Sequence, residues 1–204
     1  MYVKGIDVSS YQSDSYGTGG LDFAFIKATE GISYVNPRME KQASTARKAG
    51  LVVGFYHFLH PGALDGQAQH FVSRCASLPG DILAVDWEST SAGSATCKEK
   101  DSFIAKIKAL RPRHRVILYC NRDFWIHRDT TSFTGDGLWI ADYVAEGNPR
   151  IKAHWLFHQY SDKPVDRNVS SFASRESLRV WSRGLLNPLH AESNDERCSD
   201  RRGK

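Results

Sequence analysis

The segment Asp86-Trp87-Glu88 ends an apolar run that begins at residue 81. Successive side chains of a β-strand point to opposite faces, so the two carboxylates share one face and Trp87 points to the other. Two carboxylates at the end of a buried strand repel each other, and at least one is expected to keep its proton near neutral pH. A protonated carboxyl group is what general-acid catalysis needs, so the spacing predicts an acid–base site. We expect the Trp87 ring to be packed in the interior.

Two further carboxylates stand at the two ends of the chain's strand pattern. Asp7 lies near the end of the first strand-like run, and Asp166 lies in the last one. An isolated aspartate at such a place is usually a turn residue. If the strands close into a barrel, the first and last become neighbours, and barrel active sites form at the C-terminal ends of the strands. We therefore expect Asp7, Asp86, Glu88 and Asp166 to face one barrel mouth.

The elements that would position these carboxylates alternate between strand-like and helix-like runs. Strands are predicted at residues 3–8, 23–29, 51–58, 81–88, 115–120, 138–143, 153–160 and 165–168. The first helix is expected to begin at Pro37, with Asn36 as its N-cap, and to end at Gly50. A second helix is predicted over 63–78, and a third follows the capping box Thr96-x-x-Glu99 and extends to residue 110.

This pattern predicts an α/β protein with an irregular, incomplete TIM-like β/α barrel of about eight strands and fewer than eight helices. A complete eightfold barrel typically takes about 250 residues, whereas this chain has 204 residues. The segment 144–152 is too short for a crossover helix, so we expect some neighbouring strands near the end of the chain to be antiparallel. Residues 1–188 are expected to form one catalytic domain, and the polar residues 189–204 a disordered tail.

Aromatic residues gather at the same strand ends as the carboxylates. The C–H faces of sugar rings stack on aromatic rings, so Tyr56, Tyr119 and Trp139 are candidates for substrate binding. For Phe58 and Trp155 we expect packing in the core, because aromatic side chains carry much of a core's buried area.

Composition argues against several other classes of protein. A net charge of +4, without a run of basic residues, gives no nucleic-acid signature. No apolar segment is long enough to cross a membrane, and the first residues lack the basic-then-apolar pattern of a secretory signal. The sequence therefore predicts a protein that is made in the cytoplasm, is not inserted in membranes, and reaches an external target only after release.

Neither the histidines nor the cysteines indicate a metal or a cofactor. His57 and His60 have a spacing that would point them to opposite faces of a strand, and no third ligand accompanies them. The four cysteines, at positions 75, 97, 120 and 198, are too far apart in sequence for a zinc motif. We expect Cys75 and Cys120 to be buried thiols and expect no disulfide framework.

The carboxylate and aromatic segments together resemble the glycoside hydrolase family 25 lysozymes, the Chalaropsis-type muramidases that occur in bacteria and in many phage endolysins. The resemblance rests on GIDVSSYQ at 5–12, FIKATEG at 25–31, GFYHF at 54–58, AVDWE at 84–88, LWIADY at 138–143, and WLFHQYS at 155–161 with VDRN at 165–168. It implies cleavage of the β-1,4 bond between N-acetylmuramic acid and N-acetylglucosamine in peptidoglycan, by a monomer. It implies catalytic roles for Asp7, Asp86, Glu88 and Asp166, and substrate binding by Tyr56, Tyr119, Trp139, Lys27 and Gln159.

Two questions stay open at this level. Glu88 is expected to be the general acid. The group that attacks the anomeric carbon is either an aspartate or the substrate's own 2-acetamido group, positioned by Asp86, and we favour the acetamido group. The alternatives to a muramidase are a non-catalytic wall-binding module on the same fold and an enzyme that cleaves chitin-type N-acetylglucosamine polymers.

Overall fold

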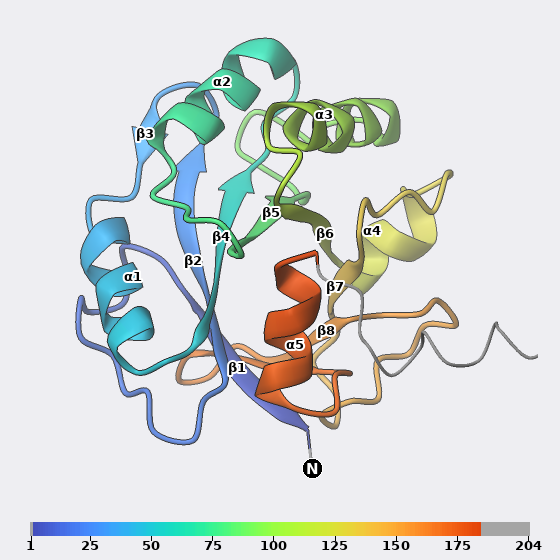
Figure 1. Ribbon diagram of the computed structural model, residues 1–204. Coiled ribbons are helices and arrows are strands. Elements are labelled where there is room, and N and C mark those ends of the chain that lie inside the picture. Colours follow the sequence, from blue (N-terminus) through green and yellow to red (C-terminus); the bar gives the residue numbers. More distant parts are fainter. Residues whose placement is uncertain (1, 185–204) are drawn as a thin grey trace, which may run out of the picture.

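The computed structural model describes residues 2–184 and contains nine strands and five helices. The strands are β1 (Val3–Val8), β2 (Phe23–Glu30), β3 (Tyr34–Val35), β4 (Val52–Phe58), β5 (Ile82–Asp86), β6 (Arg115–Asn121), β7 (Leu138–Ala141), β8 (Phe157–Ser161) and β9 (Asp166–Ser170). The helices are α1 (Met39–Lys48), α2 (Leu64–Arg74), α3 (Cys97–Leu110), α4 (Arg122–His127) and α5 (Arg175–Ser182). Figure 1 shows their arrangement.

Eight of these strands form a closed barrel. Their order is β1-β9-β8-β7-β6-β5-β4-β2, and β2 pairs with β1 to complete the circle, while the short β3 extends β2. All pairs from β1–β2 round to β7–β8 are parallel, whereas β9 is antiparallel to both of its neighbours. The predicted irregular β/α barrel with antiparallel pairing near its end is thereby confirmed.

The barrel interior is filled with large apolar side chains. Phe25 stacks on Trp139 and meets Phe157 edge-on, at ring-centroid distances of 4.3 and 5.0 Å. The helix α5 follows the last strand and closes the end of this interior, since its Leu178 is fully buried there and Trp181 packs against the same cluster. This end is opposite the predicted active site, so the open mouth lies at the C-terminal ends of the parallel strands.

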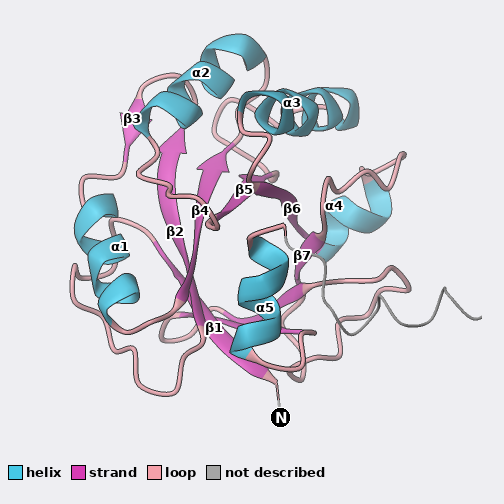
Figure 2. Ribbon diagram, viewed as in Figure 1, coloured by secondary structure: helices cyan, strands magenta, loops and turns pink. Residues whose placement is uncertain are grey.

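A second apolar layer lies between the strands and the outer helices. In Figure 2 the helices α1 to α4 form an arc outside the strands. Trp87 is fully buried in this layer, where it meets Phe124 edge-on and donates a hydrogen bond of 2.7 Å from Nε1 to the carbonyl of Ala95. The predicted interior packing of Trp87 is confirmed, and so is the capping box of Thr96 and Glu99 at the start of α3.

Several predicted boundaries differ from the structure. The first helix begins at Met39, two residues after Pro37. Asn36 still accepts a hydrogen bond of 3.0 Å from the Arg38 N–H through Oδ1, while its Nδ2 donates to the Lys27 carbonyl and to Gln42 Oε1. The second helix ends at Arg74, four residues early. The aromatic segment after β6 contains the short helix α4, and α5 was not expected. The strand that carries Asp86 ends there, so Glu88 lies two residues beyond it.

Some expectations concern residues outside the described range, namely the tail 189–204 and Cys198. The three cysteines that the structure describes are all free thiols. Among residues 2–184, no helix has the length and apolar character needed to cross a membrane.

The packing of β4 against β2 gives a test of this core. Gly54 lies beside Phe25, and a Cβ atom at Gly54 would overlap the Phe25 ring. We expect Gly54→Ala to lower the free energy of unfolding by about 1–3 kcal/mol, since overpacking displaces the ring. Urea denaturation measures this change. Gly19→Ala is the matched control, because nothing lies within 4 Å of a Cβ there, and we expect it to change stability by less than about 0.5 kcal/mol. Equal effects of the two variants would contradict the packing described.

Candidate functional site

The structure brings the four predicted carboxylates together at the mouth of the barrel. Asp7 and Asp166 are direct partners in the antiparallel pairing of β1 with β9. Asp86 ends β5 on the other side of the mouth, and Glu88 follows it. These side chains share a cavity of about 210 Å³, which is lined by Asp7, Tyr56, Asp86, Glu88, Tyr119, Trp139, Tyr143, Gln159 and Asp166.

Of the four carboxylates at the mouth, Asp7 accepts the most side-chain hydrogen bonds. Its Oδ2 accepts one of 2.8 Å from Gln159 Nε2 and one of 2.7 Å from Asn168 Nδ2. Burial, followed by the nearby charge of Asp166, raises the pKa of the Asp7 carboxyl to about 7, although both hydrogen bonds act in the opposite direction. Near neutral pH, therefore, Asp7 is divided between its charged and neutral forms.

Aromatic residues fix the two amides that hold Asp7. Trp139 Nε1 donates a hydrogen bond of 2.7 Å to Asn168 Oδ1. The Tyr119 and Tyr143 hydroxyls lie 3.0 and 3.3 Å from Gln159 Oε1. Such a network fixes which way each amide group points, with its N–H toward Asp7.

Asn168 was not among the predicted site residues. Its signal was its spacing, because it stands two positions after Asp166 in β9 and so shares that residue's face.

Asp86 and Glu88 form a coupled pair of acids. Burial and the neighbouring Glu88 charge raise the pKa of Asp86 well above its ordinary value. Burial also raises the pKa of Glu88, but a hydrogen bond with Asp86 and the charge of Lys27 lower it. Burial and the neighbouring charge therefore favour the protonated form of Asp86, while the hydrogen bond with Asp86 favours the ionised form of Glu88. The other oxygen of Asp86, Oδ1, is buried and has no hydrogen-bond partner within residues 2–184.

The predicted substrate-binding residues fall into two groups. Tyr56, Tyr119, Trp139 and Gln159 line the catalytic cavity. Lys27 does not line it, and its ammonium group lies 2.6 Å from Glu30 Oε2 and over the Phe58 ring. Substrate binding by all five residues stays a prediction.

A second cavity of about 450 Å³ adjoins the first at Glu88. It shares Tyr119 and Tyr143 with the catalytic cavity and extends toward Arg122 and Arg150. Arg150 is already paired, since its guanidinium lies 2.6 Å from Oδ1 of the buried Asp142. Glu88 therefore stands between two connected spaces, which is where an acid must lie to protonate a bond that spans them.

The two histidines of the predicted strand end do not form a metal site. His57 is fully buried, with Nδ1 2.8 Å from Thr29 Oγ1 and Nε2 3.2 Å from Gln67 Oε1, and burial lowers its pKa to about 3. His60 lies instead beside Glu30. Within the described part of the chain, no three His, Cys, Asp or Glu side chains are arranged to hold a metal ion.

Paired carboxyl groups in an aromatic-lined cavity are typical of glycoside hydrolases, in which one carboxyl group protonates the leaving oxygen. Comparison with known sequences identifies the particular family. The sequence model of glycosyl hydrolases family 25 matches residues 6–169. The chain belongs to this family and is a glycoside hydrolase.

Three relatives illustrate the similarity. Lysozyme M1 of Streptomyces globisporus is 32% identical and aligns with 90% of this chain and 70% of its own length. The N,O-diacetylmuramidase of Chalaropsis sp is 36% identical, over 79% of this chain and 80% of its own. The catalytic domain of an endolysin from a bacteriophage of Listeria monocytogenes superimposes with a TM-score of 0.73 at 25% identity, covering 88% of this chain and 98% of that domain.

The raised pKa of Asp7 has a consequence for stability. A carboxyl group whose pKa rises on folding binds more protons in the folded protein than in the unfolded chain. The Asp7 carboxyl group therefore stabilises the folded protein fully below its unfolded pKa, which is near 4, and this stabilisation is lost as the pH rises to about 7. We expect Asp7→Asn to remove a slope of up to about 1.4 kcal/mol per pH unit between pH 4 and 7. Urea denaturation across this range measures the slope. An unchanged slope would show that the Asp7 pKa is not raised.

Proposed function

We propose that this protein is a peptidoglycan hydrolase that cleaves the β-1,4 bond between N-acetylmuramic acid and N-acetylglucosamine. The observation that carries the proposal is the single cavity shared by Asp7, Asp86, Glu88 and Asp166. Relatives described as lysozyme and N,O-diacetylmuramidase support the choice of substrate.

Glu88 is the general acid in this proposal. It lies where the catalytic cavity meets the second cavity. The sugar whose anomeric carbon is attacked therefore occupies the catalytic cavity, and the leaving sugar occupies the second cavity. The glycosidic oxygen between them then lies beside Glu88, which donates the proton.

Asp86 supplies the proton and orients the substrate. The Asp86 carboxyl group lines the catalytic cavity and can accept a hydrogen bond from the N–H of the 2-acetamido group, which directs the acetamido oxygen at the anomeric carbon. Accepting that bond favours the ionised form of Asp86, so the proton shared by the pair moves to Glu88. Substrate binding thereby loads the acid at the moment of use.

Asp7 and Asp166 stabilise the positive charge that develops on the sugar ring. Both face the catalytic cavity from the adjoining strands β1 and β9. A carboxylate in a low-dielectric cavity interacts strongly with such charge. Because the Asp7 pKa is about 7, an approaching positive charge also favours its ionisation.

The biological setting follows from the substrate. The proposed partner is the glycan strand of the bacterial wall, and the protein acts as a monomer outside the cytoplasm in which it is made. Similarity to a phage endolysin domain supports a role in lysis of a host cell.

The assignment of Glu88 is tested by Glu88→Gln. The amide has the same shape but donates no proton, so we expect the fold to be kept and the rate of wall lysis to fall by about 10²–10⁴-fold. Turbidity loss of a bacterial wall suspension measures the rate, and circular dichroism checks the fold. Glu40→Gln, on the exposed face of α1, is the control that should lyse walls normally. Near-normal lysis by Glu88→Gln would refute the assignment.

The role of the acetamido group is tested with synthetic glycans whose acetyl groups carry fluorine. Electron withdrawal weakens the acetamido oxygen as a nucleophile, so the rate should fall with each added fluorine. Trapping of an aspartyl ester with a fluorosugar would instead show an enzyme nucleophile and overturn the substrate-assisted route.

Product analysis separates the proposed activity from its alternatives. Digestion of peptidoglycan and chitin in parallel should release fragments from peptidoglycan alone, with muramic acid at the new reducing end. Release from chitin would indicate an N-acetylglucosaminidase, and wall binding without product would indicate a non-catalytic module.

A further inference from the structure

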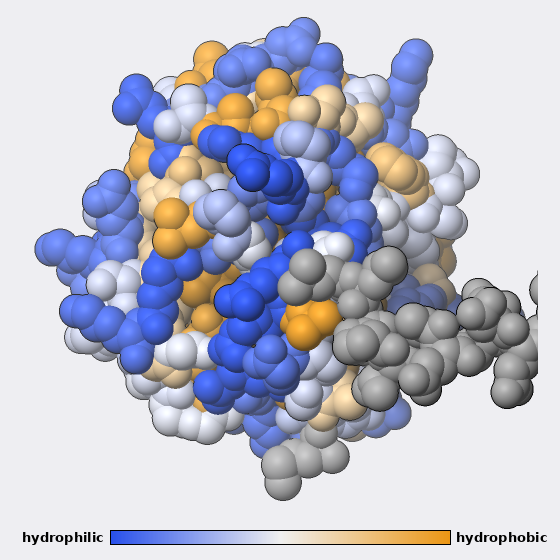
Figure 3. Space-filling view, in the orientation of Figure 1, coloured by the Kyte–Doolittle hydropathy of each residue, from blue (hydrophilic) through white to orange (hydrophobic). Residues whose placement is uncertain are grey.

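A large cavity outside the catalytic mouth lies at the other end of the barrel and carries cationic side chains. It has a volume of about 680 Å³ and lies beside the end of α5. Its walls come from segments that precede or begin β5, β6 and β7, namely Pro79, Gly80, Lys108, Pro112, Arg113, His114, Arg115, Asp136, Ser182, Arg183 and Gly184. Hydrophilic side chains gather over and above α5 on the face that Figure 3 shows.

The charges in this cavity do not cancel. Asp136 is its one carboxylate, and it lies 2.6 Å from Lys108 Nζ and 3.8 Å from Arg115 Nη1. Lys108 and Arg115 are thereby fixed in the wall. Arg113 and Arg183 have no ion-pair partner within residues 2–184, so the cavity keeps an excess of positive charge.

Two further polar atoms at this end of the barrel lack partners. His114 Nε2 and Arg111 Nε are buried and make no hydrogen bond to any described residue. Buried polar atoms in folded proteins are nearly always paired, so these two atoms are exceptions. The His114 ring lines the cavity itself.

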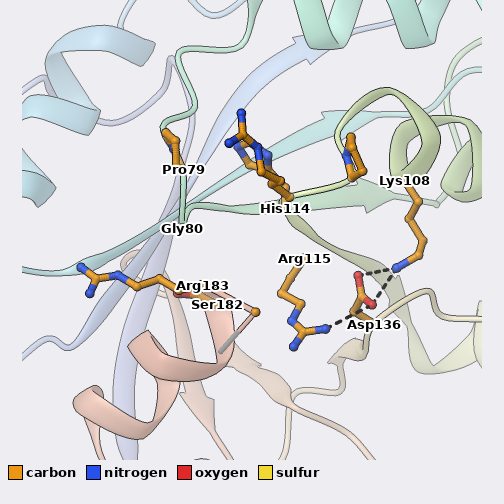
Figure 4. Close-up of a pocket in the computed structure, with 11 residues that line it drawn as sticks. Pro79, Gly80, Lys108, His114, Arg115, Asp136, Ser182 and Arg183 are labelled. Carbon is orange, nitrogen blue, oxygen red and sulfur yellow. Dashed lines mark hydrogen bonds and ion pairs between the residues drawn. The ribbon is translucent and has the colours of Figure 1, made fainter. Parts of the chain in front are cut away.

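The positions of the cations favour an extended anion over a single ion. In Figure 4 Arg183 lies on one side of the cavity, below Gly80, while Lys108, Arg115 and Asp136 lie on the other side and His114 lies between them. The stem of Arg183 is seated on Gly80, where a Cβ atom would lie 3.0 Å from Arg183 Cγ. Guanidinium groups pair well with phosphate oxygens, and cations spread around a cavity match successive phosphates of a chain.

A structural role for these cations is the competing explanation. Lys108 lies in the last turn of α3 and Arg183 is the C-cap residue of α5, where positive charge stabilises the helix dipole. Arg113 lies beyond the end of α3, so the dipole does not account for it. Nor does it account for the cavity that these cations share.

We propose that this cavity, at the end of the barrel opposite the catalytic mouth, binds the phosphate groups of an anionic polymer of the bacterial wall. Binding there leaves the mouth free for the glycan strand, so the enzyme is held at the wall while it cleaves. That the polymer belongs to the bacterial wall rests on the proposed function. Phosphate binding by the cavity does not rest on it and can be measured without any enzyme activity.

Calorimetric titration at low salt in a phosphate-free buffer tests the binding. Long-chain polyphosphate, inorganic phosphate and duplex DNA are the probes. We expect polyphosphate to bind more tightly than the other two, and added NaCl to weaken it. Absence of polyphosphate binding, equal binding of inorganic phosphate per phosphate group, or tighter binding of DNA would each overturn the proposal.

The variant Arg113→Gln/Arg183→Gln should bind polyphosphate at least about tenfold more weakly than the wild type, because two charged contacts are lost. The control Lys98→Gln/Arg128→Gln removes the same charge from exposed positions outside this cavity and should bind nearly normally. Equal weakening in both would show a general charge effect and refute the site. The melting temperature without ligand checks folding, and the single variant Arg113→Gln, which should also weaken binding, replaces the double variant if that variant is unfolded.

A wall assay then tests the location of the polymer. On walls that keep their phosphate polymers, the double variant should lyse more slowly than the wild type, and on walls stripped of them the two should be equal. If the double variant and the wild type lysed the walls at equal rates on both kinds of wall, the anchoring role would be refuted. Loss of activity by the wild type on both would count against the proposed function instead.

Discussion

Closure of the barrel by one antiparallel strand is the constraint on which the site depends. β9 lies between β8 and β1 and pairs with both. It therefore sets Asp166 directly opposite Asp7 and places Asn168 where its amide can hold the Asp7 carboxylate. Because a shift of one residue in register would turn these side chains to the outer face, the pairing of β9 fixes both the fold and the chemistry.

The mouth gathers acids without a compensating cation inside the cavity. Four carboxyl groups line about 210 Å³, and the nearest ammonium group, on Lys27, is already paired with Glu30. Burial raises the pKa of all four acids, so protonation relieves part of this electrostatic cost. The same arrangement that weakens the folded state at higher pH keeps a proton available for catalysis.

The two ends of the barrel thus differ in charge and in construction. At the mouth, strand ends bring acids together around a network of aromatic and amide side chains. At the other end, α5 closes the interior, and the charged side chains that line the cavity beside it are cations except for Asp136. An enzyme with acids at one end and cations at the other can contact a neutral sugar and an anionic polymer at the same time. The two ligands do not compete, because each binds at a different end of the barrel.

The sequence by itself determined the four acids, the strand order that brings Asp7 to Asp166, and the packing of Trp87, because strand alternation and barrel closure are local or topological rules. It did not determine that the helix after Asn36 begins only at Met39, since the Asn36 amide bonds the Lys27 carbonyl of β2 as well as Gln42 and the Arg38 N–H. Nor did it show that Gln159 and Asn168 hold Asp7 in place, or that burial raises the pKa of Asp86 well above its ordinary value. These properties depend on distances and burial between residues remote in sequence, which exist only once the barrel has closed.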